Sequence, residues 1–362
     1  MEKSLKEINE GLFAKIADNA LKNANEQAVS ASNSSLPQVV ANMSEAAKGL
    51  KSLKKAASPL PLTKVKERLV DSAISLALDK GEIEDAAFQH SILCQTFLPY
   101  RDPGDDKRLW DVKQGKARLL LKAGEVYDKP NEQWQLVGLP FGARARLILA
   151  YINTQAVKTQ KSVIDVEDSL TAFIKKLGLH NEGKTVSSVK EQLRRLAAAN
   201  INLAFETSPE SVFQTKFEIV RSFDLWFPKD DRQKVLWTST IQLDDKYFNS
   251  LMDHAVPLDE RALASLSHNA MAMDIYAWLA QRLHRVKGVE FVAWANLKEQ
   301  FGNGYDRMDN FKRVFRETLK ITLTQYPDAK IEEVNNKGFN IFNSRPPILK
   351  STFPILGLNG KN

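Results

Sequence analysis

The sequence predicts a mainly α-helical α+β fold with small β hairpins, and three observations lead to this prediction. Apolar residues recur at helical spacing over much of the chain, and short alternating segments bounded by turn residues separate these stretches. The order helix, helix, basic helix, hairpin occurs twice, with corresponding helices roughly 125 residues apart. The 362 residues are 43% hydrophobic and 26% charged, which is typical of globular domains.

The N-terminal region, residues 1–61, is predicted to be a flexible helical arm. Two stretches rich in Ala and Lys are separated by a Ser-rich link at 30–37, and they hold too few apolar residues for a core. We therefore expect the arm to be a tail that binds a partner protein. The break at 58–61 precedes the first folded helix, predicted at 63–80 and ended by Gly81.

Residues 62–235 are predicted to form a first winged-helix domain together with preceding helices and a small sheet. The predicted elements are strands at 117–122 and 132–137, helices at 143–157, from 166 and after 185, and hairpin strands at 201–205 and 216–222. In the third helix we expect Val186, Val189, Leu193 and Leu196 to face inward. The expected outward residues are Ser188, Lys190, Gln192, Arg194 and Arg195.

Residues 236–350 are predicted to form a second winged-helix domain, followed by a C-terminal tail at 351–362. The predicted elements are a helix at 269–285, a strand at 289–292, helices at 295–301 and 307–326, and strands at 330–334 and 338–343. The segment 307–320 holds five basic and two acidic residues, while Phe311, Val314, Phe315 and Leu319 supply a buried face. One side of this helix is therefore expected to pack and the other to be cationic.

Charge and cysteine content limit the possible partners and compartment. The formal net charge is +7, which favours a polyanionic partner. Cys94 is the single cysteine, so an intramolecular disulfide is excluded. The charged N-terminus lacks a signal-peptide pattern and no apolar run is long enough to span a bilayer, so we expect a cytoplasmic protein without membrane contact.

Two basic third helices predict binding to double-stranded DNA. In a winged helix the third helix enters the major groove and the hairpin touches the flanking backbone. Arg side chains match guanine O6 and N7, and Lys supplies charge beside phosphate. The alternative is that these basic residues form a solvated helix face without function. The candidate DNA contacts are Lys184, Thr185, Ser188, Lys190, Arg194, Arg195, Arg307, Asn310, Lys312, Arg313, Arg316, Lys320 and, on the second hairpin, Lys337.

The sequence also resembles a known family. The stretch Gly138-Leu-Pro-Phe-Gly-Ala-Arg-Ala-Arg-Leu-Ile-Leu149 and the later Glu191-Gln-Leu-Arg-Arg-Leu196 are similar to plasmid replication initiators of the RepA type. The Gly-Lys-Thr turn before the third helix and the segments 97–100 and 109–110 fit as well. The resemblance covers 97–225 by motif and extends to about 345 by element order. The family's turn is usually richer in Gly, with Arg at the position of Ser188.

This resemblance implies binding to repeated sites in a plasmid origin, strand opening there, and recruitment of the host initiator and the replicative helicase. It further implies a monomer that initiates and a homodimer that represses its own gene. By the same resemblance, the second domain reads bases while the first contacts backbone or forms the dimer interface. A protein that acts only as a transcriptional repressor is an alternative with the same domains.

A second alternative is a nucleoside triphosphatase, because Gly178–Thr185 matches the phosphate-binding loop G-x-x-x-x-G-K-[ST]. That loop requires a buried strand before it and a helix after it, whereas 170–177 has helical periodicity. We therefore expect a turn between two helices. His90 and Cys94 would share a helix face, but partners to complete a metal site are lacking, so we expect no catalytic site, cofactor or metal.

Overall fold

The computed structural model describes most of the chain that follows the predicted arm. The described residues are 63–78, 86–128, 132–165, 170–208, 211–217, 219–224 and 240–348. They fall into two compact units, Met1–Lys80 and Gly81–Asn362. The predicted arm, the predicted C-terminal tail and all three predicted domain boundaries lie outside the described residues.

The described part of the first unit is one helix, α3 (Lys64–Leu78). The hydroxyl of Thr63 accepts a hydrogen bond from the backbone N–H of Lys66 at 3.4 Å, as the residue before a helix often does. Glu67 in the first turn suits the positive end of the helix dipole. The helix start predicted from the sequence is confirmed.

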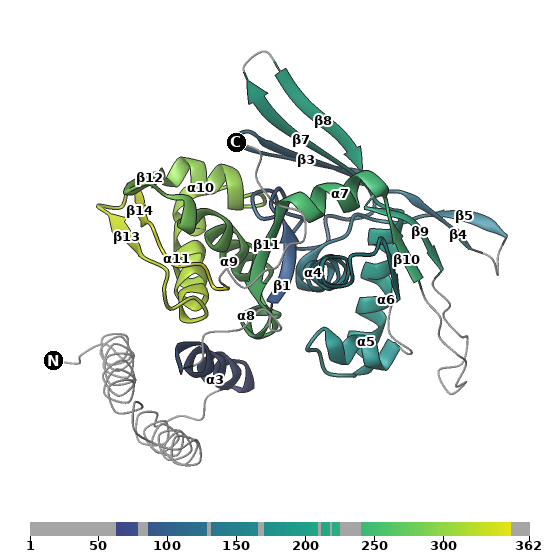
Figure 1. Ribbon diagram of the computed structural model, residues 1–362, viewed down its shortest axis with the longest axis horizontal. Helices are drawn as coiled ribbons and strands as arrows, with labels where there is room; N and C mark the ends of the chain where they lie inside the picture. The colour runs from purple at the N-terminus through teal and green to yellow at the C-terminus, as the bar shows by residue number, and fades with distance from the viewer. Residues whose placement is uncertain are drawn as a thin grey trace. The chain divides into compact units, whose positions relative to one another are not determined.

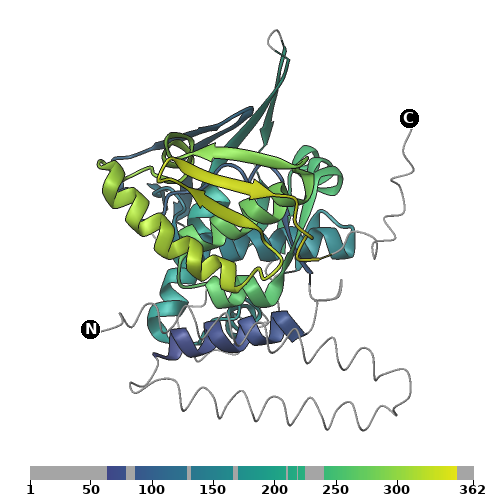
Figure 2. The ribbon, with the colours of Figure 1, turned by 90° about the vertical axis from the view of Figure 1, so that its left-hand side faces the viewer.

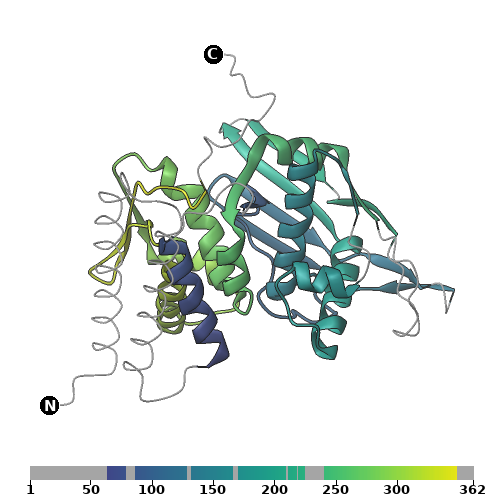
Figure 3. The same cartoon turned by 60° about the horizontal axis from the view of Figure 1, so that its bottom comes forward.

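The second unit contains a first lobe built on an antiparallel four-stranded sheet in the order β2–β3–β7–β8 (Figures 1 and 3). Its strands are β2 (Leu109–Gln114), β3 (Ala117–Lys122), β7 (Asn200–Ser208) and β8 (Ser211–Phe217). Its helices are α4 (Gly142–Thr159), α5 (Leu170–Lys176), α6 (Gly183–Ala198) and α7 (Asp245–His254). Two smaller sheets complete it: β4 (Glu125–Asp128) with β5 (Gln133–Leu136), and β6 (Val163–Asp165), β10 (Thr240–Leu243) and β9 (Val220–Asp224).

Alternation of apolar residues explains why the four-stranded sheet forms. In β3, Leu119 and Leu121 are fully buried, and they pair across the ladder with Leu203 and Ile201 of β7. Side chains two residues apart lie on the same face of a strand, so these four residues form one apolar layer. That layer supplies the first lobe with its core.

A second lobe follows, in which three helices lie beside a small antiparallel sheet (Figure 2). Its elements are α9 (Ala270–Arg282) with a 3₁₀ turn (Leu283–Arg285), β12 (Val289–Ala293), α10 (Trp294–Phe301), α11 (Met308–Thr324), β13 (Ile331–Val334) and β14 (Gly338–Phe342). The strand order is β12–β14–β13. An aromatic core joins sheet and helices, since the ring of Trp294 packs edge-on against Phe311, Phe315 and Phe339.

The two lobes are joined by backbone pairing and by a buried ion pair. Strand β1 (Ala86–His90) pairs with β11 (Ala255–Asp259), which leads into α8 (Glu260–Leu266). Arg146 of α4 donates from Nε and Nη2 to the two carboxylate oxygens of Asp274 of α9, at 2.7 and 2.6 Å. Both side chains are less than 10% exposed. The lobes therefore meet through specific polar contacts within one compact unit.

The structure confirms the predicted α+β fold with small sheets, and it corrects the sequence analysis in four places. The stretches 117–122 and 132–137 lie in two different sheets. The segment 216–222, predicted to be the second hairpin strand, holds the end of β8 and the start of β9, which lie in different sheets. The connector 240–266 contains four elements that the sequence analysis did not predict, namely β10, α7, β11 and α8. His90 ends a strand and a turn follows, so His90 and Cys94 do not share a helix.

Candidate nucleic-acid interface

Helix α11 has one buried face and one cationic face. Phe311, Phe315, Leu319 and Thr322 are buried, and their spacing of three or four residues places them on one side of the helix. Asp309 in the first turn stabilises the positive end of the helix dipole. The amphipathic helix predicted at 307–326 is confirmed.

Four of the predicted contacts on α11 are exposed: Arg307, Asn310, Arg313 and Lys320. Arg313 donates to Glu317 at 3.3 Å and to the Asn310 side-chain oxygen at 3.1 Å, and its side chain is 61% exposed. Exposed ion pairs of this kind contribute only about 0.2–1 kcal/mol, so a phosphate or a base edge can replace them.

The hairpin β13–β14 ends in a tight turn beside α11. Asn335 and Asn336 both have positive φ, 42° and 57°, and the backbone N–H of Lys337 donates to the carbonyl of Val334 at 2.8 Å. Positive φ at both central residues defines a turn whose twist matches that of paired strands. Gly338 follows the turn because a Cβ there would collide with the carbonyl oxygen of Val292. Lys337, the predicted hairpin contact, is thus exposed at the tip.

The turn is tied to both neighbouring helices. The backbone N–H of Trp294, the first residue of α10, donates to the carbonyl of Lys337 at 3.1 Å. Lys312 of α11 donates from Nζ to the backbone oxygen of Asn336 at 3.1 Å. Arg316 donates to Glu333 of β13 and to the side chain of Asn336. Of the predicted contacts, Lys312 and Arg316 therefore already have partners in the hairpin.

Helix α6 of the first lobe presents fewer of its predicted contacts. Lys184 is exposed, whereas Ser188, Lys190 and Arg194 are half-buried and Thr185 is buried. Arg194 donates to the side-chain oxygen of Gln135 in β5. Lys184 is therefore the fully exposed cation among the residues predicted for this helix.

Two residues of α6 that the sequence analysis placed outward are buried. Arg195 donates to Glu191, to Asp102 and to the carbonyl of Leu139, so its charge is satisfied inside the first lobe. Gln192 accepts the backbone N–H of Phe141 at 2.8 Å. Both side chains form hydrogen bonds with backbone groups of loops, and this explains why they are buried. The outward placement of Gln192 and Arg195 was wrong.

The segment Gly178–Thr185 connects two helices. Helix α5 ends before Gly178, whose φ of 70° is the left-handed value usual after a helix, and the backbone N–H of Leu179 donates to Ile174 at 3.1 Å. Helix α6 begins at Gly183. Every strand pairing within the described ranges is antiparallel. The predicted turn between helices is confirmed, and the strand that a phosphate-binding loop requires is replaced by α5.

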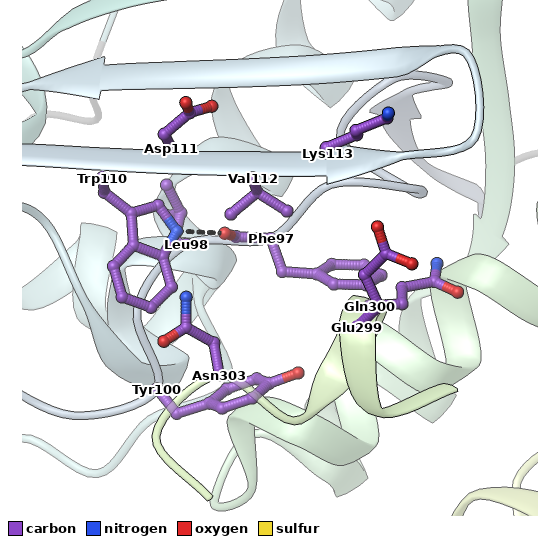
Figure 4. Close-up of a pocket in the computed structure, with 10 residues that line it drawn as sticks. All are labelled: Phe97, Leu98, Tyr100, Trp110, Asp111, Val112, Lys113, Glu299, Gln300 and Asn303. Atoms are coloured by element: carbon purple, nitrogen blue, oxygen red, sulfur yellow. Dashed lines mark hydrogen bonds between the residues drawn. The ribbon is translucent and has the colours of Figure 1, made fainter. Parts of the chain in front are cut away.

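A cavity of about 210 Å³ lies where β2 meets α10 (Figure 4). Phe97, Trp110 and Val112 line it from the first lobe, and Glu299 and Gln300 from the second. The indole N–H of Trp110 already donates to the Phe97 carbonyl at 2.8 Å. The cavity is smaller than the roughly 300–1,000 Å³ of typical small-molecule sites.

His90 and Cys94, the two residues considered as metal ligands in the sequence analysis, are both buried. Burial lowers the pKa of His90 to about 3, and the nearby His254 acts in the same direction. Among the described residues, no group of three or more His, Cys, Asp and Glu side chains is placed to hold a metal ion. No helix in the described ranges has the length and apolar content to cross a bilayer.

The contacts that Trp294, Glu333 and Asn336 make with α11 were not predicted from the sequence. The Asn335-Asn336 pair between two apolar strands was the available signal, since such pairs favour turns with positive φ. The role of Glu333 had no comparable signal, because its partner Arg316 lies 17 residues earlier.

The chain is similar to a known protein family over a segment that ends before α11. Residues 139–295 match the family model of the plasmid-encoded RepA protein. This segment, which runs from the residues before α4 to the start of α10, is therefore similar to the RepA family, and the resemblance predicted from the sequence is confirmed.

Two solved structures of RctB are also similar to this chain. Selenomethionine derivatives of its domains 2 and 3 share 12% sequence identity, cover 77% of this chain and 100% of their own, and give a TM-score of 0.45. Another crystal structure of RctB domains 2–3 shares 12% identity, with coverage of 69% and 94% and a TM-score of 0.43. No curated protein sequence matches the chain.

Proposed function

We propose that this protein is a plasmid replication initiator whose two lobes are tandem winged-helix domains that bind double-stranded DNA at a replication origin. The observation that carries the proposal is the exposed cationic face of α11 beside the hairpin that bears Lys337. The family match to plasmid-encoded RepA supports a role in plasmid replication, since it covers most of the first lobe and the start of the second.

The arrangement of the second lobe supports its assignment as a winged helix. Helices α9, α10 and α11 are followed by the hairpin β13–β14, and β14 also pairs with β12. In such a body the third helix lies in the major groove and the hairpin reaches the flanking backbone. Arg307 and Arg313 would supply forked donors for guanine, and Lys320 and Lys337 would supply charge beside phosphate.

The first lobe has the same order of elements, with α4, α5, α6 and the hairpin β7–β8. Because α6 exposes mainly Lys184 and holds Arg195 inside, we propose that this lobe adds backbone contacts while the second lobe reads bases. Further parts of the proposal are origin opening, recruitment of host initiator and helicase, a monomer–homodimer equilibrium and a cytoplasmic location. These follow from the family resemblance.

We expect Arg313→Ala to weaken binding to a specific duplex by about 1–3 kcal/mol, because an Arg that contacts a base contributes that much. The measurement is fluorescence anisotropy with duplexes from the DNA that flanks the gene, repeated at several salt concentrations. Lys287→Ala is the matched control. Lys287 is also exposed and basic, but it precedes β12 at the end of the sheet opposite the hairpin turn.

Equal and negligible effects of Arg313→Ala and Lys287→Ala would contradict the proposed role of α11. A uniform loss on every sequence, with a flatter dependence on salt, would make Arg313 a phosphate contact and not a base contact.

A further inference from the structure

Glu333 is the acidic centre of the contact between α11 and the hairpin. Its carboxylate accepts from Arg316 Nε at 2.9 and 3.1 Å and from Nη2 at 2.6 Å. The two side chains are 30% and 35% exposed, so the pair is half-buried. The hydrogen bonds from Arg316 hold the pKa of Glu333 below its ordinary value, so the pair stays ionised to a lower pH than an isolated Glu would.

The same guanidinium reaches the turn of the hairpin. Arg316 Nη2 also donates to the side-chain oxygen of Asn336 at 2.6 Å, and the guanidinium lies over the indole ring of Trp294, 4.9 Å from its centroid. Two of its three nitrogens are therefore engaged within the protein. A bidentate contact to guanine needs two nitrogens of the guanidinium, so it would have to break either the pair with Glu333 or the hydrogen bond to Asn336.

Lys312, one helical turn before Arg316, also connects α11 to the turn of the hairpin. Its Nζ donates to the backbone and side-chain oxygens of Asn336, at 3.1 and 3.3 Å, and lies 5.4 Å from the centroid of the Trp294 ring. Asn336 thus accepts from two cations of α11. These contacts set the position of the turn that carries Lys337.

Arg313 also has two nitrogens hydrogen-bonded within the protein, but it differs from Arg316 in where its partners lie and in its exposure. Its hydrogen-bond partners Asn310 and Glu317 are on α11 itself, so none of these hydrogen bonds reaches the hairpin. Its side chain is 61% exposed, against 35% for Arg316.

We propose that Arg316 and Glu333 are a positioning pair that fixes the hairpin against α11, so that Lys337 meets phosphate while Arg313 reads the base. This inference rests on the proposed function and assigns different roles to two arginines of the same helix. Glu333 is expected to favour binding although it is an acid beside a polyanion, because its charge is paired with Arg316 and the pair holds the hairpin against α11.

The test compares Glu333→Gln with Glu332→Gln in duplex-binding assays on the full chain. Both changes remove one negative charge from β13, but Glu332 pairs across the ladder with Asn340, whereas Glu333 pairs with Phe339 on the opposite face. We expect Glu332→Gln to leave binding unchanged or slightly tighter. Glu333→Gln is expected to weaken binding about 3- to 10-fold, equivalent to about 0.7–1.4 kcal/mol.

A double-mutant cycle separates positioning from a general loss of stability. In the unaltered protein Lys337→Ala is expected to weaken binding and lower the salt slope by about one. In the Glu333→Gln background Lys337→Ala is expected to add little, because the hairpin is already displaced. Arg313→Ala is expected to cost the same in both backgrounds.

Arg316→Lys provides a second, independent variant if Glu333→Gln does not fold. It keeps the charge but loses the fork, so a positioning role predicts a loss similar to that of Glu333→Gln, whereas a simple phosphate contact predicts little loss. The inference is overturned if Glu333→Gln tightens binding as Glu332→Gln does, or if Lys337→Ala keeps its full effect in the Glu333→Gln background. Failure of the unaltered protein to bind any duplex would instead refute the proposed function.

Discussion

Asp274→Ala is expected to lower the free energy of unfolding of the second unit by about 3–5 kcal/mol, since removing one partner of a buried ion pair leaves the other charge uncompensated. The charge left behind is that of Arg146, whose side chain is 6% exposed. Burial raises the pKa of the Asp274 carboxyl, and the charge of Arg146 acts against this rise. The measurement is the midpoint of urea unfolding.

Arg146 forms further hydrogen bonds in addition to its pair with Asp274. Its guanidinium also donates to the carbonyls of Leu98 at 2.7 Å, Pro99 at 3.2 Å and Gly142 at 2.8 Å. Asp274→Ala therefore releases a group that also holds the loop before α4. The loss is expected to affect both lobes together.

The matched control is Glu317→Ala, which removes the acid from the exposed pair with Arg313 on α11. Pairs of this kind contribute about 0.3–0.5 kcal/mol, so the control is expected to unfold almost as the unaltered protein does. Similar small losses for Asp274→Ala and Glu317→Ala would show that Arg146 is not held by Asp274 in solution.

The contribution of His90 to stability is expected to fall as the pH is lowered from 6.5 to 5, because His90 is buried as a neutral ring. Its Nδ1 accepts the backbone N–H of Ile92 at 3.2 Å, which leaves Nε2 to donate to the hydroxyl of Ser250 at 3.0 Å. In the unfolded chain the imidazole has a pKa of 6.5, against about 3 in the fold. Below pH 6.5 the unfolded state therefore binds one more proton than the folded state.

For His90 alone the slope is expected to approach about 1.4 kcal/mol per pH unit, or about 1.7 kcal/mol in total between pH 6.5 and 5. Burial raises the pKa of Asp274 to about 6, which acts in the opposite direction, so the His90 part is the difference between the unaltered protein and His90→Gln. Urea unfolding at several pH values measures it. His90→Gln is expected to lower stability at neutral pH but to remove this part of the slope, and His180→Gln, at an exposed position, is expected to keep it. A slope unchanged by His90→Gln would contradict the assignment.

Local periodicity was sufficient to predict α11 and the elements around it. Phe311, Phe315 and Leu319 repeat at the spacing of one helix face, and that face is buried as expected. The turn at Gly178 could likewise be predicted, because the apolar residues before it, such as Phe173 and Ile174, follow helical spacing and lie in the buried core.

Contacts between residues far apart in the chain were not predictable from such patterns. Arg195 and Gln192 occupy polar positions of an amphipathic helix. They are buried because they form hydrogen bonds with Asp102 and Phe141, which the fold brings next to the helix. Arg146 and Asp274 are 128 residues apart, so no local spacing relates them. Arg316 and Arg313 were likewise given the same predicted role as DNA contacts, because the position of Glu333 relative to α11 depends on the tertiary fold.

Footprinting of the full-length protein on the DNA that flanks its gene tests the central claim most directly. We expect several protected segments in repeated orientation, with protection lost in Arg313→Ala at concentrations where Lys287→Ala still protects. Absence of protection by the unaltered protein, or identical protection by the two variants, would contradict the assignment of α11 as the helix that reads an origin.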